Sequence, residues 1–445
     1  MTWSRREFLY SALSASAVFP LAGKGLTSDV FLPPNPSMQD NTALLNELER
    51  AAFEYFWNET NPRTGLVRDR ALADGGDTRN LASVAATGFG LTALCIGHQR
   101  GYRPPQEIKA RVQSSLQFLA QQAPHVHGFF YHFVDMETGA RSHNSEISPI
   151  DMAIFLCGVL TCRAYFEDPE IRRNAEVLYN RVNWTWALNK GTTFAMAWKP
   201  ETGFSAHRWD SYCESMMLYL LAMGSSTHPI PNECWNNIRR PWMTYGSYHF
   251  ISSPAPLFVH QFSHAWFDFR GKQDEYTNYF ENSVLASQAH QQFCEELNRQ
   301  FPCYSRKVWG ITASDSRKGY VAWGGPPMQG PIDGTIVPAA AAGSLPFVFN
   351  DAVGVLKNLR SYYGDKIWKR YGFVDAFNPL TGWVSRDVLG IDVGISMLMA
   401  ENARSQFVWN TFMRNPEVKV AMDRASFRPL GEPMLASHAT AKISG

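Results

Sequence analysis

Acidic and aromatic residues stand together in the segment that holds Trp209, Asp210, Tyr212 and Glu214, directly before an apolar run. Aromatic neighbours desolvate a carboxyl group and raise its pKa, and a general acid at neutral pH needs a raised pKa. The spacing of Ser211 and Glu214 is also that of a helix capping box, in which the glutamate satisfies a backbone N–H group. The residues alone leave open whether Glu214 is a catalytic acid or a structural cap.

Two further acidic segments carry the same ambiguity. Ser148 suits the N-cap of a helix and Pro149 its first position, so Asp151 at the third position can be purely structural. Glu146 precedes this helix and has no capping role, which makes it the stronger candidate for chemistry. Asp392 stands at the start of another apolar helical run, where a catalytic role and a capping role both remain open.

A pair of histidines, His260 and His264, has the four-residue spacing that can hold zinc on a helix. The metalloprotease pattern requires Glu after the first histidine, and this chain has Gln261 there, with no evident third ligand nearby. We therefore predict no metal and no other cofactor. The aromatic and polar residues around this pair favour a wall that binds sugar.

The composition supports a carbohydrate as the substrate. The chain has 14 Trp, 17 Tyr and 29 Phe, and an aromatic ring can stack on the apolar C–H face of a pyranose. Lys plus Arg (41) balances Asp plus Glu (40), which argues against a nucleic-acid binder and, weakly, against a polyanionic substrate. Phosphate-binding glycine loops and serine nucleophile elbows are absent from the sequence. Aromatic walls and paired carboxylates thus indicate hydrolysis of a glycan.

The elements that must position these residues are mostly helices. Period-two strand patterns are rare and short, which predicts an all-α class with minor β content in the loops. Apolar residues at helical spacing predict helices over 44–57, 83–97, 106–121, 150–166, 215–223 and 353–363.

A Thr-Gly turn recurs along the chain, at Thr64, Thr138, Thr202 and Thr381. The spacing between these turns fits units of about 60–75 residues, each long enough for a helical hairpin, and such repeats indicate a closed array. Six hairpins that close on themselves form an (α/α)6 toroid. Its inner helices open their N-termini into one cavity, where the helix dipole favours carboxylates, so we expect the acids to gather there.

The ends of the chain predict an exported protein. Arg5 and Arg6 precede a short apolar run, as in a twin-arginine signal peptide over residues 1–23. A linker follows over 24–41, a single domain over 42–420 and a tail over 421–445. Seven cysteines without a CxxC pair do not suggest a disulfide framework. We expect a periplasmic or secreted protein with no stable membrane insertion after signal removal.

These motifs resemble those of the bacterial glycoamylase-like domain family, which contains glycoside hydrolase family 144, over about residues 42–420. The segments that carry the resemblance are 85–90, 128–135, 144–146, 260–270, 309–315 and 372–378. The resemblance implies an (α/α)6 barrel and metal-independent, inverting hydrolysis of β-1,2-glucan or its oligosaccharides. It ranks α-1,4-glucan lower.

An inverting enzyme needs an acid and a base on opposite sides of the scissile bond. The resemblance implies Glu214 as the acid, with Asp392 and Glu146 as competing candidates for the base. Ser148-Pro149 departs from the family pattern, so the backbone near Asp151 can be set differently. The residues implied to line the cleft are Asp135, Asp151, Trp209, Asp210, His260, His264, Trp266, Asp268, Arg270, Trp309, Asp315, Trp323, Asp375 and Trp383.

Other functions would retain most of these residues. A transglycosylase acting on the same glucan would differ in its water path, and a non-catalytic periplasmic glucan-binding protein would need the tryptophans but not Glu214. We expect a glucan or oligosaccharide as the binding partner, no nucleic acid, and a monomer. The sequence does not determine endo or exo action.

Overall fold

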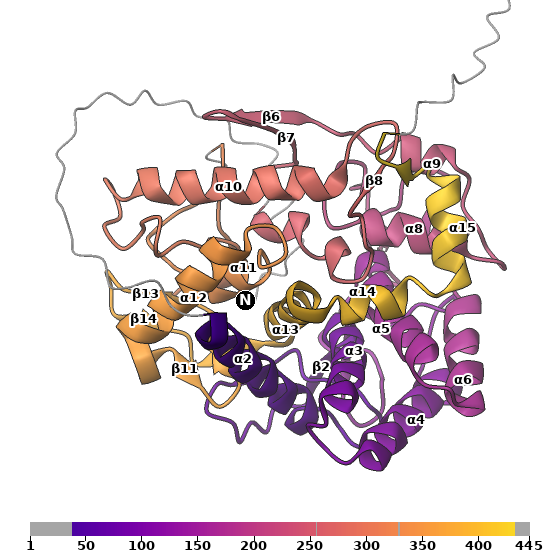
Figure 1. The fold of residues 1–445 in the computed structure, drawn as a ribbon. Helices are drawn as coiled ribbons and strands as arrows, with labels where there is room; N and C mark the ends of the chain where they lie inside the picture. Colours follow the sequence, from indigo (N-terminus) through magenta and orange to yellow (C-terminus); the bar gives the residue numbers. More distant parts are fainter. Residues whose placement is uncertain (1–37, 255, 328–329, 432–445) are drawn as a thin grey trace, which may run out of the picture.

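The computed structural model describes residues 38–254, 256–327 and 330–431, and most of these residues form or connect helices (Figure 1). The predicted signal peptide over 1–23 lies outside the described residues, as do most of the predicted linker and the end of the tail. The strands within the described ranges are short and occur as separate two-stranded pairs. The predicted all-α class with minor β content is confirmed.

Inner helices form a closed ring. Helix α3 packs against α5, α5 against α8, α11 against α13, and α13 against α3. Apolar residues surround most of these helices, and nearly every one of their positions is buried, as expected for a helix enclosed on all sides. The inner helices are α3 (Val84–Arg100), α5 (Pro149–Tyr165), α8 (Met216–Gly224), α11 (Pro338–Ala342) and α13 (Gly390–Ser405).

Two short 3-10 helices, η1 (Leu257–His260) and η2 (Ser263–Ala265), complete the ring between α8 and α11. The backbone N–H of Met217 in α8 donates to Ser263 Oγ at 3.0 Å. The Gln261 side-chain amide donates to the carbonyl oxygen of Ala340 in α11 at 2.9 Å. The predicted toroid is confirmed, and one of its inner positions is held by these two turns instead of an α-helix.

Outer helices cover this ring and bury only one face each, as the amphipathic patterns predict. The longer helices outside the ring are α2 (Met38–Asn58), α4 (Pro105–Gln121), α6 (Pro169–Asn180), α10 (Tyr279–Leu297), α12 (Phe349–Tyr363) and α15 (Pro416–Arg424). Shorter helices are α7 (Trp184–Ala187), α9 (Glu233–Asn236), α14 (Phe407–Phe412) and η3 (Gly364–Lys366). Each of the six helices predicted from the sequence is present, with ends shifted by a few residues.

Hairpins and long-range strand pairs occupy the loops. All pairs are antiparallel. They are β1 (Arg70–Leu72) with β15 (Asp387–Leu389), β2 (Leu81–Ser83) with β3 (Phe133–Asp135), β4 (Trp198–Lys199) with β5 (Gly203–Phe204), β6 (Trp242–Tyr245) with β7 (Tyr248–Ile251), β8 (Lys272–Gln273) with β16 (Arg428–Pro429), β9 (Ala313–Ser316) with β10 (Gly319–Ala322), β11 (Trp368–Lys369) with β12 (Gly372–Phe373), and β13 (Phe377–Asn378) with β14 (Trp383–Val384).

The recurring Thr-Gly turns share one place in the fold. Each lies in a loop that leads to the start of an inner helix: α3, α5, α8 or α13. The glycines have φ between 70° and 75°, the left-handed conformation that glycine adopts without steric cost. The turn therefore marks the points at which the chain reverses toward the ring.

The folded domain extends beyond both of its predicted boundaries. Helix α2 begins at Met38, within the predicted linker. Helix α15 runs past residue 420 to Arg424, and β16 pairs with β8, so residues 421–431 join the domain. Among the described residues, no helix combines the length and apolar character needed to span a membrane.

Candidate active site

The N-terminal ends of α3, α5 and α13 meet around a small cavity. Ser83 is the N-cap of α3, Asp151 lies in the first turn of α5, and Leu389 is the N-cap of α13. Strands β1 and β10 complete the wall. The residues that line this central cavity are Asp69, Arg70, Ser83, Ala85, His132, Phe133, Asp151, Tyr320, Leu389 and Ile391. Carboxylates gather there, as expected for a place where helix N-termini converge.

Glu214 lies just before the inner helix α8 and is 1% exposed. The capping box does not form, because α8 begins at Met216 and its N-cap is Ser215. Ser211 instead pairs with Arg239 through the backbone. The capping interpretation of Glu214 is therefore wrong.

A second cavity, of about 410 Å³, is lined by the segment that precedes Glu214 in the sequence. Trp209, Asp210 and Cys213 line one side of it, and Arg239 and Met243 line another. Asp210 forms an ion pair with Arg239 at 3.0 Å. The Trp209 indole N–H is buried and has no hydrogen-bond partner among the described residues, which leaves a donor for a ligand or water.

Glu146 and Asp151 meet at one imidazole. His132 Nδ1 lies 3.1 Å from Glu146 Oε1, and His132 Nε2 lies 3.7 Å from Asp151 Oδ1. Ser148 caps α5 as predicted, with its Oγ accepting from the Asp151 backbone N–H. Asp151 therefore belongs to the first turn of α5 and also faces the central cavity.

Asp392 belongs to a chain of carboxyl groups. It sits in the first turn of α13, is 6% exposed, and hydrogen-bonds to the buried Asp375. Burial raises the pKa of Asp375 well above its usual value, and the neighbouring Asp392 and Asp315 carboxylates raise it further. The Asp315 backbone N–H donates to Asp375 Oδ2 at 2.7 Å. Both carboxylate oxygens of Asp315 accept hydrogen bonds from Arg70, at 2.9 and 2.8 Å.

Several residues expected on a sugar-binding wall lie in the core. Trp266 and Trp309 have no exposed surface. His260 bonds to the Tyr212 hydroxyl at 3.0 Å, and His264 to Ser283 Oγ at 3.1 Å. Burial lowers the pKa of both histidines to about 3, so both are neutral at neutral pH. Their positions favour packing roles.

Other predicted residues are held by local polar contacts. Asp268 and Arg270 form an ion pair with each other at 2.9 Å, and Arg270 lies over the Trp409 ring. Asp135 accepts from the backbone N–H of Thr138 at 2.9 Å, so it stabilises one of the recurring turns.

Two of the predicted tryptophans lie in or next to strands. Trp323 donates to Ser314 Oγ at 3.0 Å and is 5% exposed. Trp383, in β14, is half-buried. The structure therefore brings Asp151 to the central cavity, and Trp209 and Asp210 to the second one. Trp323 and Trp383 lie outside both linings, and Asp315 reaches the central cavity only through its bond to Arg70.

The structure adds residues that the sequence did not single out as site candidates, namely His132, Arg70 and Tyr320. The Tyr131-His132 pair lies inside a family-like segment, which was the available signal for His132. Tyr320 lies in the aromatic, glycine-rich run over 319–325, which was the available signal for it. Arg70 carries no local motif, because strand pairing brings it to the cavity. Within the described ranges, no three His, Cys, Asp or Glu residues are placed to share a metal ion.

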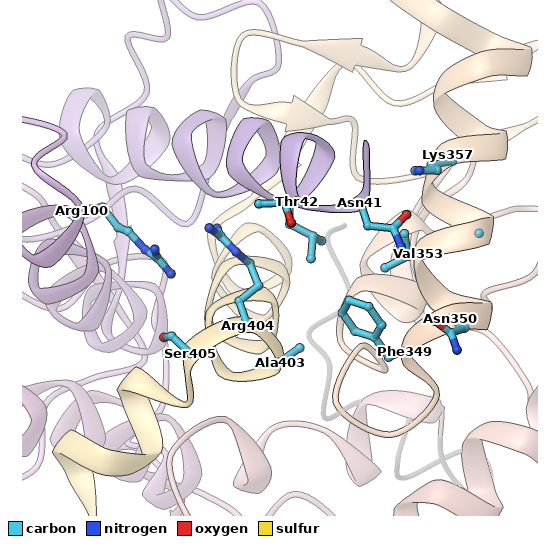
Figure 2. A pocket seen from close by; sticks show the side chains of 12 residues that line it. Asn41, Thr42, Arg100, Phe349, Asn350, Val353, Lys357, Ala403, Arg404 and Ser405 are labelled. Atoms are coloured by element: carbon cyan, nitrogen blue, oxygen red, sulfur yellow. The ribbon is translucent and has the colours of Figure 1, made fainter. Parts of the chain in front are cut away.

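A larger cavity, of about 1030 Å³, lies at the opposite ends of α3 and α13 (Figure 2). Arg100 ends α3 and Arg404 lies in the last turn of α13. Arg100 is bonded to Glu401 and Arg404 to Glu49. None of the acids predicted for catalysis lines this cavity, so its size alone does not make it the candidate site.

Comparisons with known proteins agree with the observed fold. A family model described as putative glucoamylase matches residues 206–416. An exo β-1,2-glucooligosaccharide sophorohydrolase (non-reducing end) of Parabacteroides distasonis is 27% identical across 86% of this chain. The chain spans 57% of the length of that relative.

Solved structures match over most of the chain. An endo-β-1,2-glucanase from Chitinophaga pinensis, solved with sophorotriose and glucose, has a TM-score of 0.80 and 27% identity, covering 87% of this chain and 98% of its own. A structure from Bacteroides uniformis described as a putative glucoamylase has a TM-score of 0.81 and 25% identity, covering 89% and 99%. The chain is thus similar to the glycoamylase-like family, the same family that its motifs resemble.

Proposed function

We propose that the chain is a glycoside hydrolase that cleaves β-1,2-glucan or its oligosaccharides by an inverting acid/base mechanism. The observation that carries this proposal is the set of carboxyl groups at the N-terminal ends of the inner helices: Glu214 before α8, Asp151 in α5 and Asp392 in α13. Relatives that share this fold are named as β-1,2-glucan-degrading enzymes.

In this proposal Glu214 is the general acid. It is almost fully buried, has no capping role, and directly follows Cys213, which lines the second cavity with Trp209 and Asp210. The orphaned indole N–H of Trp209 suits a sugar hydroxyl group in that cavity. A general acid gives its proton to the leaving oxygen as the glycosidic bond breaks.

Asp392 is the proposed general base, with Glu146 as the alternative. An inverting base removes a proton from a water molecule as that water attacks the anomeric carbon from the face opposite the leaving group. Asp392 shares a hydrogen bond with Asp375, a group that burial keeps protonated, so the pair needs to carry only one negative charge. Glu146 is instead held by His132.

The first test is a substrate panel. The purified mature chain is incubated with linear β-1,2-glucan and, in parallel, with β-1,3-glucan, β-1,4-glucan and soluble starch, while reducing ends are followed. Release from β-1,2-glucan alone is the expected result. Release from starch alone would overturn the linkage, and no release from any glycan would favour a binding protein or a transglycosylase.

Product analysis refines the result. The anomeric form of the first product, measured by NMR before mutarotation, distinguishes inversion from retention. Chain lengths of the products distinguish hydrolysis from glycosyl transfer. They also distinguish release of disaccharides from internal cleavage, and the relatives named above include both an exo-acting and an endo-acting enzyme.

A further inference from the structure

His132 lies between two acids, Glu146 in the loop before α5 and Asp151 in the first turn of α5. Its backbone is fixed on both sides: its N–H donates to the Glu146 carbonyl at 2.8 Å, and its carbonyl accepts from Val84 at the start of α3 at 3.1 Å. Its ring stacks on Phe133 with centroids 3.8 Å apart. The imidazole is 9% exposed and cannot move far without breaking these contacts.

Both ring nitrogens face a carboxyl oxygen. Nδ1 is within hydrogen-bond distance of Glu146 Oε1 at 3.1 Å, and Nε2 is within ion-pair distance of Asp151 Oδ1 at 3.7 Å. A neutral imidazole carries one N–H group, so the other nitrogen would turn its lone pair to a carboxylate. Two ionised acids are therefore compatible only with an imidazolium.

Several polar and charged groups surround His132 and the two acids. Arg141 acts electrostatically on Glu146, while Asp69, Arg70 and Tyr320 share the central cavity with His132. Arg70 is already engaged by Asp69 at 3.0 Å and by Asp315 at 2.8 Å. The Ser148 hydroxyl bonds to Asp151 Oδ2, which leaves Asp151 Oδ1 turned to the imidazole.

We propose that His132 is a positioning residue that, as an imidazolium, holds Glu146 by a hydrogen bond and keeps Asp151 ionised towards the central cavity. The functional part of this inference rests on the glucan hydrolase proposed above. An ionised Asp151 is a strong acceptor for a sugar hydroxyl group, so the charge on His132 contributes to substrate binding.

Kinetic variants test this role. Asn in His132→Asn can replace the Nδ1–H bond to Glu146 but carries no charge for Asp151. We expect His132→Asn to raise KM about tenfold and leave kcat within about threefold. In the wild type KM should rise as the imidazolium loses its proton, and in His132→Asn KM should not vary over that pH range. His249→Asn is the matched control, because His249 is an exposed residue of β7. A fall in kcat with unchanged KM would overturn the proposal.

The charge itself is measured without substrate. In the full chain labelled with ¹⁵N-histidine, the ring signals of His132 are those missing from His132→Asn. We expect both nitrogens to be protonated at about pH 7, and expect Asp151→Asn to return the ring to the neutral form. A neutral His132 at this pH in the wild type overturns the proposal. If no glucan is hydrolysed, the proposed function fails while these spectra still decide the charge of His132.

Discussion

Glu214 is a buried acid that serves no helix cap. The helix whose capping box it would complete begins two residues later, so the sequence pattern has no structural use there. Buried acids elsewhere in the fold have structural roles. Asp274, for example, accepts from the Trp235 indole at 3.0 Å and the Tyr279 hydroxyl at 2.9 Å.

We expect Glu214→Gln to lower kcat by ~10³ or more, because the amide cannot give a proton to the leaving oxygen. The measurement is kcat on β-1,2-glucan, with circular dichroism to check folding. Asp274→Asn is the control for altering a buried acid elsewhere and should retain activity. Equal losses in the two variants would mean that Glu214 acts only through stability.

Substitutions of Asp375 test whether this residue holds a proton in its hydrogen bond to Asp392. Since burial and two neighbouring carboxylates raise its pKa well above the usual value, Asp375 donates a hydrogen bond at neutral pH. Asn is the same shape and can also donate to Asp392 while accepting from Asp315. We therefore expect Asp375→Asn to keep kcat/KM within about tenfold and Asp375→Leu to lose ~10²-fold or more. A severe loss in Asp375→Asn would show that the ionised form is required.

Close contact between α3 and α5 depends on two glycines. A Cβ atom on Gly158 would lie 2.1 Å from the carbonyl oxygen of Gly88, and one on Gly88 would lie 2.3 Å from that of Ile154. Real side chains cannot occupy these positions unless one helix moves. These two inner helices carry Ser83 and Asp151 to the central cavity, so their spacing also sets the site.

We expect Gly158→Ala to lower the free energy of unfolding by about 3 kcal/mol or more, as overpacking against backbone does. Denaturant unfolding gives the measurement. Gly354→Ala in α12 is the matched control, because its Cβ would meet no atom within 4 Å. It should raise stability by up to about 1 kcal/mol, the helix propensity gain. A neutral Gly158→Ala would contradict the close approach of the two helices.

Contacts between carboxyl and guanidinium groups connect the middle of α2 to the C-terminal ends of α3 and α13, on the side away from the candidate catalytic acids. Glu49 in α2 bonds to Arg404 at 2.7 Å, and Glu401 in α13 bonds to Arg100 at 2.8 Å. Burial and the neighbouring Glu401 raise the pKa of Glu49 from 4.5 to about 8. The folded protein thus keeps a proton that the unfolded chain releases above pH 4.5.

This raised pKa fixes the sign of a pH effect. The contribution of Glu49 to the free energy of unfolding is fully present below pH 4.5, and this contribution is lost as the pH rises to about 8. The slope is at most about 1.4 kcal/mol per pH unit. Glu49→Gln should remove this slope, so it gains stability relative to wild type between about pH 5 and 8. Thermal unfolding at several pH values measures it, with the exposed Glu47→Gln as control. If the unfolding temperatures of the three proteins changed in parallel with pH, the raised pKa of Glu49 would be contradicted.

At the scale of the whole molecule, the compartment remains a proposal from the sequence. We propose export by the twin-arginine route, which rests on Arg5 and Arg6 ahead of the apolar run. The full chain with both residues changed to Lys should stay in the cytoplasm of a producing bacterium, as judged by fractionation. Changing Arg50 and Arg63 to Lys is the control. Unchanged export of the first variant would indicate the general secretory route instead.

The sequence by itself determined the helices, the recurring turns and the positions of the acids along the chain. These depend on local physics: apolar spacing defines a helix face, Ser148 and Pro149 begin α5, and glycine permits the left-handed turns. The spacing of the turns predicted a closed ring, and the family resemblance implied the same ring.

Only the tertiary structure decided which residues meet. His132 contacts Asp151 across a loop, Arg70 bonds to Asp315 from a distant part of the chain, and Trp266 is buried although its motif resembles a binding wall. Local sequence carries no information on these pairings, because closing the ring sets the distances between remote segments. The same closure decides whether a histidine or tryptophan faces a cavity or fills the core.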